Sequence, residues 1–207
     1  PAYSPDGTQI AFVKNGSGNT NLGIRTIETG EIKYLTQFDD GSQVSTPRWS
    51  PDGTQIAFSI YRPGASHDIA TIATTGGDYT VRVASHETDR DPCWTPDGSS
   101  IVFASDQDGI FNLYRANLTD GTIKRITRVY GGAFQPHVHP TDNRIAFAHY
   151  GKKAYEIRVI DGGLNEPVDP SIFQTEPFLP TVANPERESR PYKNEFSTTS
   201  ILPRLAI

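Results

Sequence analysis

Two histidines two positions apart, His137 and His139, are the residues of this chain best suited to metal chemistry. Alternate side chains of a β-strand point to the same face, so both imidazoles are expected on one side. Zinc sites, however, use three or four His, Cys or acidic ligands, and no Cys or third His lies near this pair. The prediction is no metal site, with both histidines at the surface or lining a channel.

Two other short motifs resemble parts of known sites without completing them. The stretch Ser105–Gly109 (SDQDG) has some of the acidic spacing of a calcium loop but lacks the remaining ligands, including the bidentate Glu. Asp and Gly are also the residues expected in a hairpin loop. Gly64–Asp68 (GASHD) is not the Gly-x-Ser-x-Gly of a hydrolase nucleophile elbow. No catalytic residue, cofactor or metal is therefore predicted.

A charged connector, His86–Pro92 (HETDRDP), offers residues for binding a partner. Loops carried on a rigid scaffold often hold binding residues, although a solvated loop is the simpler interpretation. Four of its members are candidate partner-binding residues: His86, Asp89, Arg90 and Asp91.

A repeat must position these residues, because the nine letters SPDGTQIAF occur at 4–12 and again at 50–58. Weaker copies follow, and the closing Phe falls at 12, 58, 103 and 147, which are 46, 45 and 44 residues apart. A period of 40–50 residues is typical of propellers and solenoids. Each unit contains short apolar runs rich in β-branched and aromatic residues, without helical periodicity. The predicted fold is all-β, a β-propeller or partial propeller of four four-stranded blades over 1–160.

The repeated Ser-Pro-Asp-Gly is predicted to turn the chain rather than to do chemistry. Pro presets φ, Asp bonds local backbone N–H groups, and Gly tolerates the positive φ that follows a type I turn. The fourth unit has lost this pattern at Thr141 and Asp142. Arg48, Cys93 and His137 occupy equivalent positions on successive innermost strands, so they are expected to line a central channel, with Arg48 and His137 as candidate binding residues.

Bulk composition excludes several classes of protein. A net charge of −5 argues against nucleic-acid binding and against a polybasic membrane patch. No apolar run approaches the roughly 20 residues of a membrane helix, and one cysteine permits no internal disulfide. The chain has no Met and opens on Pro1, so it is expected to be a mature or internal piece of a longer product, from which an export signal could have been removed.

At these repeats the chain resembles the TolB-type propellers of bacterial envelope proteins, which carry an aromatic residue, Ser-Pro-Asp-Gly and Ile-Ala-Phe. The motif stands at Tyr3–Phe12, Trp49–Phe58 and Trp94–Phe103, and loosely at Val138–Phe147. The resemblance implies a periplasmic or envelope protein that binds other proteins and has no conserved active site. Family propellers usually have six or more blades, so four blades form either a small closed ring or an arc. Prolyl oligopeptidase relatives carry similar turns on the propeller of a hydrolase.

The segment 161–207 is predicted to be a Pro-rich extended arm or linker, since it holds seven of the sixteen prolines and no repeat. It wraps its own propeller or binds a partner. Its aromatic residues are the candidate anchors: Phe173, Phe178, Tyr192 and Phe196. The letters PYKNEFS also resemble the segment that joins some envelope propellers to an outer-membrane barrel.

Three functions remain open. The preferred one is a non-enzymatic protein-binding scaffold, an accessory subunit of a periplasmic or cell-envelope assembly that includes a membrane complex or an outer-membrane barrel. The alternative is the propeller of a prolyl oligopeptidase-like hydrolase, or a channel-site enzyme, whose catalytic part is outside this chain. A third is a glycan- or small-molecule-binding propeller that uses Trp49 and Trp94, although their repeated position favours packing between blades.

Overall fold

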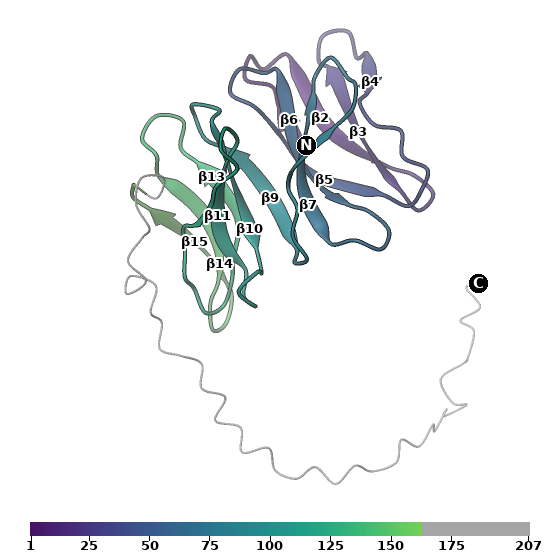
Figure 1. The fold of residues 1–207 in the computed structure, drawn as a ribbon. Helices are drawn as coiled ribbons and strands as arrows, with labels where there is room; N and C mark the ends of the chain where they lie inside the picture. The colour runs from purple at the N-terminus through teal and green to yellow at the C-terminus, as the bar shows by residue number, and fades with distance from the viewer. Residues whose placement is uncertain (163–207) are drawn as a thin grey trace, which may run out of the picture.

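Residues 1–162 are described by a computed structural model, in which fifteen strands form four antiparallel sheets (Figure 1). The predicted all-β class is confirmed. The described residues contain no helix with the length and hydropathy needed to cross a lipid bilayer. The expected Pro-rich arm at 161–207 and its four aromatic anchors lie outside the described residues, apart from Asp161 and Gly162.

Three of the four sheets have four strands, and each sheet is a meander in which the strands follow sequence order. The first sheet contains β1 (Ala2–Tyr3), β2 (Gln9–Asn15), β3 (Thr20–Thr26) and β4 (Ile32–Tyr34). The second contains β5 (Gln43–Trp49), β6 (Gln55–Tyr61), β7 (His67–Ala73) and β8 (Thr80–Val83). The third contains β9 (Asp89–Trp94), β10 (Ser100–Ser105), β11 (Asn112–Asn117) and β12 (Ile123–Arg125).

The four-stranded pattern expected of every blade is observed in the first three sheets, and the described part of the fourth sheet is shorter. It contains three strands among the described residues: β13 (Ala133–Val138), β14 (Ile145–Tyr150) and β15 (Tyr155–Ile160). Gly162 has a positive φ of 67°. Gly30 (71°) and Gly121 (72°) have a similar φ shortly before the fourth strands of the first and third sheets. The described residues therefore end at the point where a fourth strand begins in those sheets.

The Ser-Pro-Asp-Gly turns have the predicted geometry. In the first unit the Gly7 N–H donates to the Ser4 carbonyl at 2.9 Å, and the Asp6 carboxylate accepts from the Ser4 hydroxyl and the Thr8 N–H at 2.6 and 3.0 Å. The φ of Gly7 is 71°. In the fourth unit, where Gly is missing, Asn143 takes the positive φ of 60° one position later. Asn tolerates this conformation better than most residues, so the turn survives in altered form.

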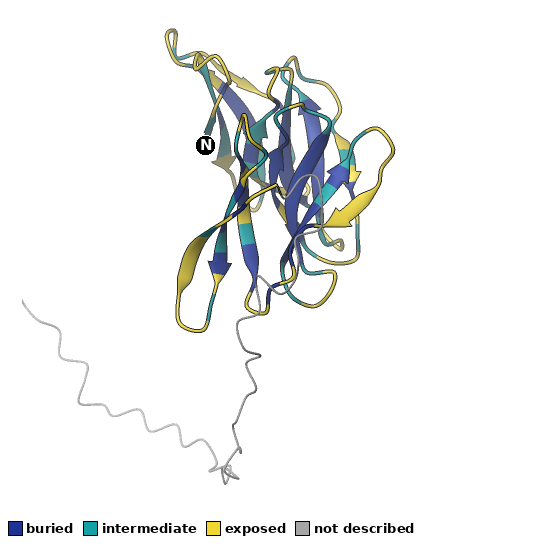
Figure 2. Cartoon of the chain, turned by 90° about the vertical axis from the view of Figure 1, so that its left-hand side faces the viewer, coloured by how far each residue is buried: buried dark blue, intermediate teal, exposed yellow. Residues whose placement is uncertain are grey.

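The sheets pack face to face in sequence order, first on second, second on third and third on fourth. This stacking explains the apolar second strands, because both faces of an inner sheet are covered. β10 is buried along its whole length, and five of the seven residues of β6 are buried. Figure 2 shows the buried residues along the middle strands and the exposed ones in loops and outer strands.

Candidate functional site

The innermost strands of the second, third and fourth sheets share an unusual backbone feature. A non-glycine residue with positive φ precedes a buried proline in each strand: Thr46 (49°) before Pro47, Asp91 (56°) before Pro92, and Gln135 (51°) before Pro136. The pairing with the next strand shifts register at the same three places. Such β-bulges bend a strand and redirect the side chains that follow.

A polar chain connects the three bulges across the sheets. The Thr46 and Ser59 hydroxyls lie 2.9 Å apart, and the Asp91 N–H donates to Ser59 Oγ at 3.1 Å. The Asp91 carboxylate in turn accepts from the Gln135 N–H at 3.3 Å and from Arg90 Nε at 3.2 Å. The N–H groups of Asp91 and Gln135 are thus bonded by side chains of the neighbouring sheet, which offsets the cost of removing them from the ladder.

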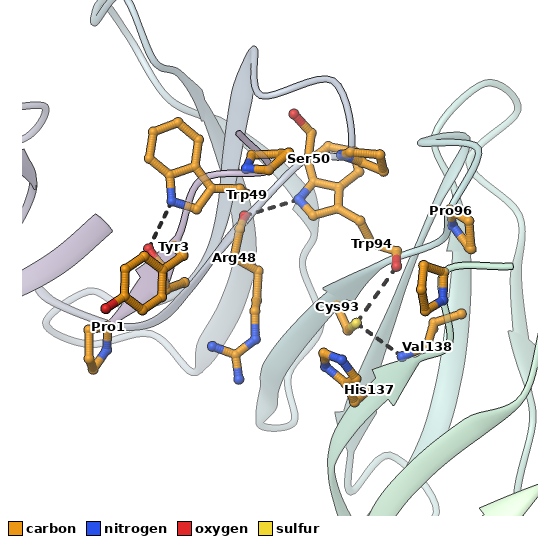
Figure 3. Close-up of a pocket in the computed structure, with 14 residues that line it drawn as sticks. Pro1, Tyr3, Arg48, Trp49, Ser50, Cys93, Trp94, Pro96, His137 and Val138 are labelled. Carbon is orange, nitrogen blue, oxygen red and sulfur yellow. Dashed lines mark hydrogen bonds between the residues drawn. The ribbon is translucent and has the colours of Figure 1, made fainter. Parts of the chain in front are cut away.

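The residues that follow the bulges line a cavity of about 600 Å³ among the inner strands of all four sheets (Figure 3). Its wall is mainly rings and aliphatic groups. The repeat supplies Pro5, Pro51, Pro96 and Pro140 from the four turns, and Tyr3, Trp49, Trp94 and Val138 from the strand ends. This volume falls in the usual range of small-ligand pockets, so the cavity can hold a short peptide segment or a small molecule.

The two tryptophans join neighbouring sheets while their rings face the cavity. Trp49 Nε1 donates to the Ala2 carbonyl at 3.0 Å, and Trp94 Nε1 donates to the Arg48 carbonyl at 3.1 Å. The same hydrogen bond is therefore repeated at two successive junctions. Because the indole N–H groups are occupied, the rings offer the cavity an apolar surface and no free donor.

Arg48, Cys93 and His137 all line the cavity, so the sequence-based placement of these three residues agrees with the structure. The Cys93 thiol is 6% exposed and its Sγ accepts from the Val138 N–H at 3.4 Å. Burial raises the pKa of this thiol, opposed by the Val138 hydrogen bond and by Arg48. Cys93 packs in the apolar cluster at the junction of the third and fourth sheets.

The charged connector divides into exposed and buried residues and does not line this cavity. His86 and Arg90 are exposed, whereas Asp89 is 1% and Asp91 4% exposed. Burial raises the pKa of Asp89, while the nearby Ser105 hydroxyl and the hydrogen bond from Ser85 oppose that shift. Asp91 belongs to the polar chain between the bulges. The Asp91 carboxylate bonds the Gln135 N–H of the fourth sheet, whereas the Asp89 carboxylate accepts from the hydroxyl of Ser85, which directly precedes the connector.

The other sequence motifs are held in local contacts. His139 does not line the cavity with His137, since its Nδ1 lies 2.9 Å from Asp142 Oδ1 in the turn. In the SDQDG loop, Asp106 accepts from the Thr88 N–H at 2.7 Å and Asp108 accepts from the Tyr114 hydroxyl at 2.7 Å. Within residues 1–162, no group of three or more His, Cys, Asp or Glu side chains is arranged to hold a metal ion.

Sequence reasoning missed the ring of prolines and the exposed ring of Tyr3 at the cavity mouth. A signal was present, because Pro5, Pro51, Pro96 and Pro140 recur with the same period as the repeat. The sequence explained these prolines as turn residues, and their second role, as part of the cavity wall, was not predicted.

Stacked antiparallel meanders with inner strands around a common cavity define a β-propeller type of arrangement. The family model of the TolB β-propeller domain matches residues 1–177, and the chain belongs to this family. No curated protein matches the chain.

Solved structures agree with this assignment. TolB from Acinetobacter baumannii matches with a TM-score of 0.65 and 23% identity over 78% of this chain and 40% of that protein. A TolB-type protein from Agrobacterium tumefaciens gives 0.68 and 23%, over 78% of this chain and 60% of that one. A prolyl endopeptidase gives 0.58 and 16%, over 81% and 28%. The chain thus spans less than two thirds of each of these structures, and the likeness concerns the fold.

Proposed function

We propose that this chain is a non-enzymatic, protein-binding part of a bacterial cell-envelope assembly, located in the periplasm. Membership in the TolB propeller family supports the class and the compartment. The observation that carries the binding role is the cavity itself. It combines an apolar wall of Pro, Trp and Tyr rings with Arg48 and His137, and rings with a few placed polar groups are typical of binding sites.

The domain organisation belongs to the same proposal. Residues 1–160 form the propeller blades that carry the cavity, and 161–207 form an arm that contacts the partner through its aromatic residues. The exposed connector residues His86 and Arg90 add charged contacts at the rim of the assembly. The partners are other proteins of the envelope, including a membrane complex or an outer-membrane barrel, and no nucleic acid.

Site-specific photo-crosslinking in envelope material tests this function. A photoreactive amino acid at Tyr3, which lines the cavity and is 68% exposed, is expected to give a discrete crosslink to another polypeptide. The same residue at Ile27, which is 46% exposed and not in the cavity wall, serves as the control. Identical products at both positions, or crosslinks within this chain alone, would contradict the proposal.

The alternative is a propeller that accompanies a hydrolase or another catalytic part. Its support is the likeness to a prolyl endopeptidase and to an oligogalacturonate lyase, the latter with a TM-score of 0.56 and 17% identity. The same experiment separates the two functions. A crosslink from Tyr3 to a catalytic domain of the same gene product would favour the alternative.

A further inference from the structure

The cavity contains a cation without a counterion. Arg48 is half-buried, and its guanidinium Nη1 donates to the Pro47 carbonyl at 3.1 Å. No carboxylate of residues 1–162 forms an ion pair with it, and no Asp or Glu lines the cavity. A guanidinium has five N–H donors, so most of its hydrogen-bonding capacity is open to a ligand.

The neighbouring groups make Arg48 the main polar anchor. Both indole N–H groups donate to backbone carbonyls, and the Ser50 hydroxyl bonds Asp52 and Gln55 within its turn. The His137 ring is exposed and makes no hydrogen bond within the described residues. In Figure 3 the Arg48 side chain extends away from the two indole rings, toward the side where His137 lies.

We infer that the cavity binds an acidic side chain of an extended peptide segment, held by a carboxylate–Arg48 pair and flanked by apolar residues. The inference rests on the proposed protein-binding function and names the chemistry of the partner. Charge complementarity selects the carboxylate, since a planar guanidinium matches it with two parallel hydrogen bonds. The Pro, Trp and Tyr rings select the apolar flanks, and the volume of about 600 Å³ limits the ligand to a few residues.

The first step of the test identifies ligands without assuming a sequence. A library of random decapeptides, displayed by fusion at their C-termini so that none has a free terminal carboxylate, is selected against the full chain. Selected decapeptides are then made as amides and titrated into ¹⁵N-labelled protein. The only two tryptophans line the cavity, so their indole N–H signals report occupancy directly.

The expected result is that selected peptides contain Asp or Glu and shift both indole signals. Replacing that residue by Asn or Gln, or introducing Arg48→Gln, should each weaken binding at least about tenfold. Arg48→Lys should retain part of the affinity because it keeps the charge. Arg25→Gln, an exposed change outside the cavity, should leave affinity unchanged. Well-dispersed spectra of each variant establish that it is folded.

The outcomes separate this inference from the proposed function. Peptides that shift the indole signals but need neither an acidic residue nor Arg48 would overturn the carboxylate pairing and leave protein binding intact. Failure to select any peptide that shifts the indole signals would contradict both.

Discussion

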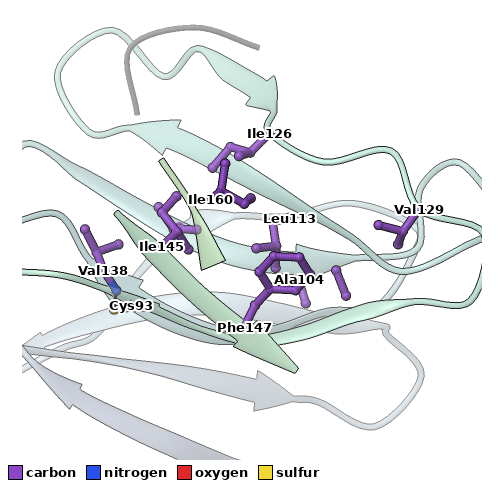
Figure 4. Close-up of a cluster of buried hydrophobic side chains, with 11 residues drawn as sticks. Cys93, Ala104, Leu113, Ile126, Val129, Val138, Ile145, Phe147 and Ile160 are labelled. Carbon is purple, nitrogen blue, oxygen red and sulfur yellow. Dashed lines mark hydrogen bonds between the residues drawn. The ribbon is translucent and has the colours of Figure 1, made fainter. Parts of the chain in front are cut away.

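Equivalent positions of the third and fourth sheets carry similar aliphatic side chains but differ in how far these are buried. Leu113 on β11 and Ile157 on β15 occupy equivalent register positions, paired with Ala104 and Ala148 of the preceding strands. Leu113 is fully buried because the fourth sheet covers it with Ile145, Phe147 and Ile160 (Figure 4). Ile157 is 85% exposed. Burial at this position is thus decided by the next sheet in the stack and not by the residue.

The two ends of the stack also differ from each other. On the outward face of the first sheet, Lys14 and Arg25 are exposed at the positions where the second sheet buries Ile60 and Ile72. Lys14 lies 5.1 Å from the centroid of the Tyr34 ring, a cation–π arrangement. The outward face of the fourth sheet instead exposes Val159 (57%) beside Ile157. At the compared positions the outward face of the first sheet thus carries charged side chains, whereas that of the fourth carries apolar ones.

Truncating the two equivalent residues should give the largest contrast. Leu113→Ala should lower the free energy of unfolding by about 2–5 kcal/mol, the usual cost of a cavity in a packed core. Ile157→Ala should change it by no more than about 0.5 kcal/mol, since the side chain is exposed. Urea titrations followed by circular dichroism measure both. An equal loss for Ile157→Ala would mean that another segment covers this face in the whole chain.

Removing the acceptor between the bulges tests how the third sheet holds the fourth. Asp91→Ala leaves the half-buried N–H of Gln135 without its carboxylate acceptor and should cost about 1–3 kcal/mol. Asp120→Ala is the control, because its carboxylate is exposed and bonds Thr122 within a turn. If the two variants lost equal stability in urea, the polar chain would have no special role at this junction.

Acidification should weaken the covered junction through His149, which lies at the register position of Ile60 and is 1% exposed. Burial lowers the pKa of His149, with a smaller contribution from Arg158. The unfolded state therefore binds the proton more readily, and stability is lost as the pH falls below about 6.5. His149→Ile should flatten the change in urea midpoint between pH 7.5 and 5.5. His86→Ala, an exposed control, should keep it.

Restoring the turn of the fourth unit should have the smallest effect. Thr141→Asp with Asp142→Gly recreates the Pro-Asp-Gly of the other units and should add about 0.5–1 kcal/mol. The exposed ion pairs of Asp142 with Arg144 and His139 are lost, but such pairs contribute little. A lower thermal midpoint for the double variant would show that the shifted turn at Asn143 suits this sheet better.

Sequence alone predicted the repeat, the turns and three of the residues that face the cavity, Arg48, Cys93 and His137. The period aligned Arg48 with His137, and strand alternation placed them on the inner face. It could not foresee that Asp89 and Asp91 are buried in a connector rich in charge, because burial there depends on how the chain packs around them, such as the contact of Asp91 with Gln135 of the fourth sheet. The sequence also shows that the fourth turn lacks Gly, but not which residue adopts the positive φ in its place. The local backbone geometry gives that role to Asn143.

The order of the sheets determines the order in which this part of the chain is expected to unfold. Since each sheet packs on its sequence neighbours, the described residues form a linear array with three interfaces between sheets. Unfolding of a sheet at one end then removes one interface between sheets and leaves the other two intact. Amide protons of β6 and β10 should consequently exchange more slowly than those of β2 and β14, as a gradient from the centre of the array to its ends.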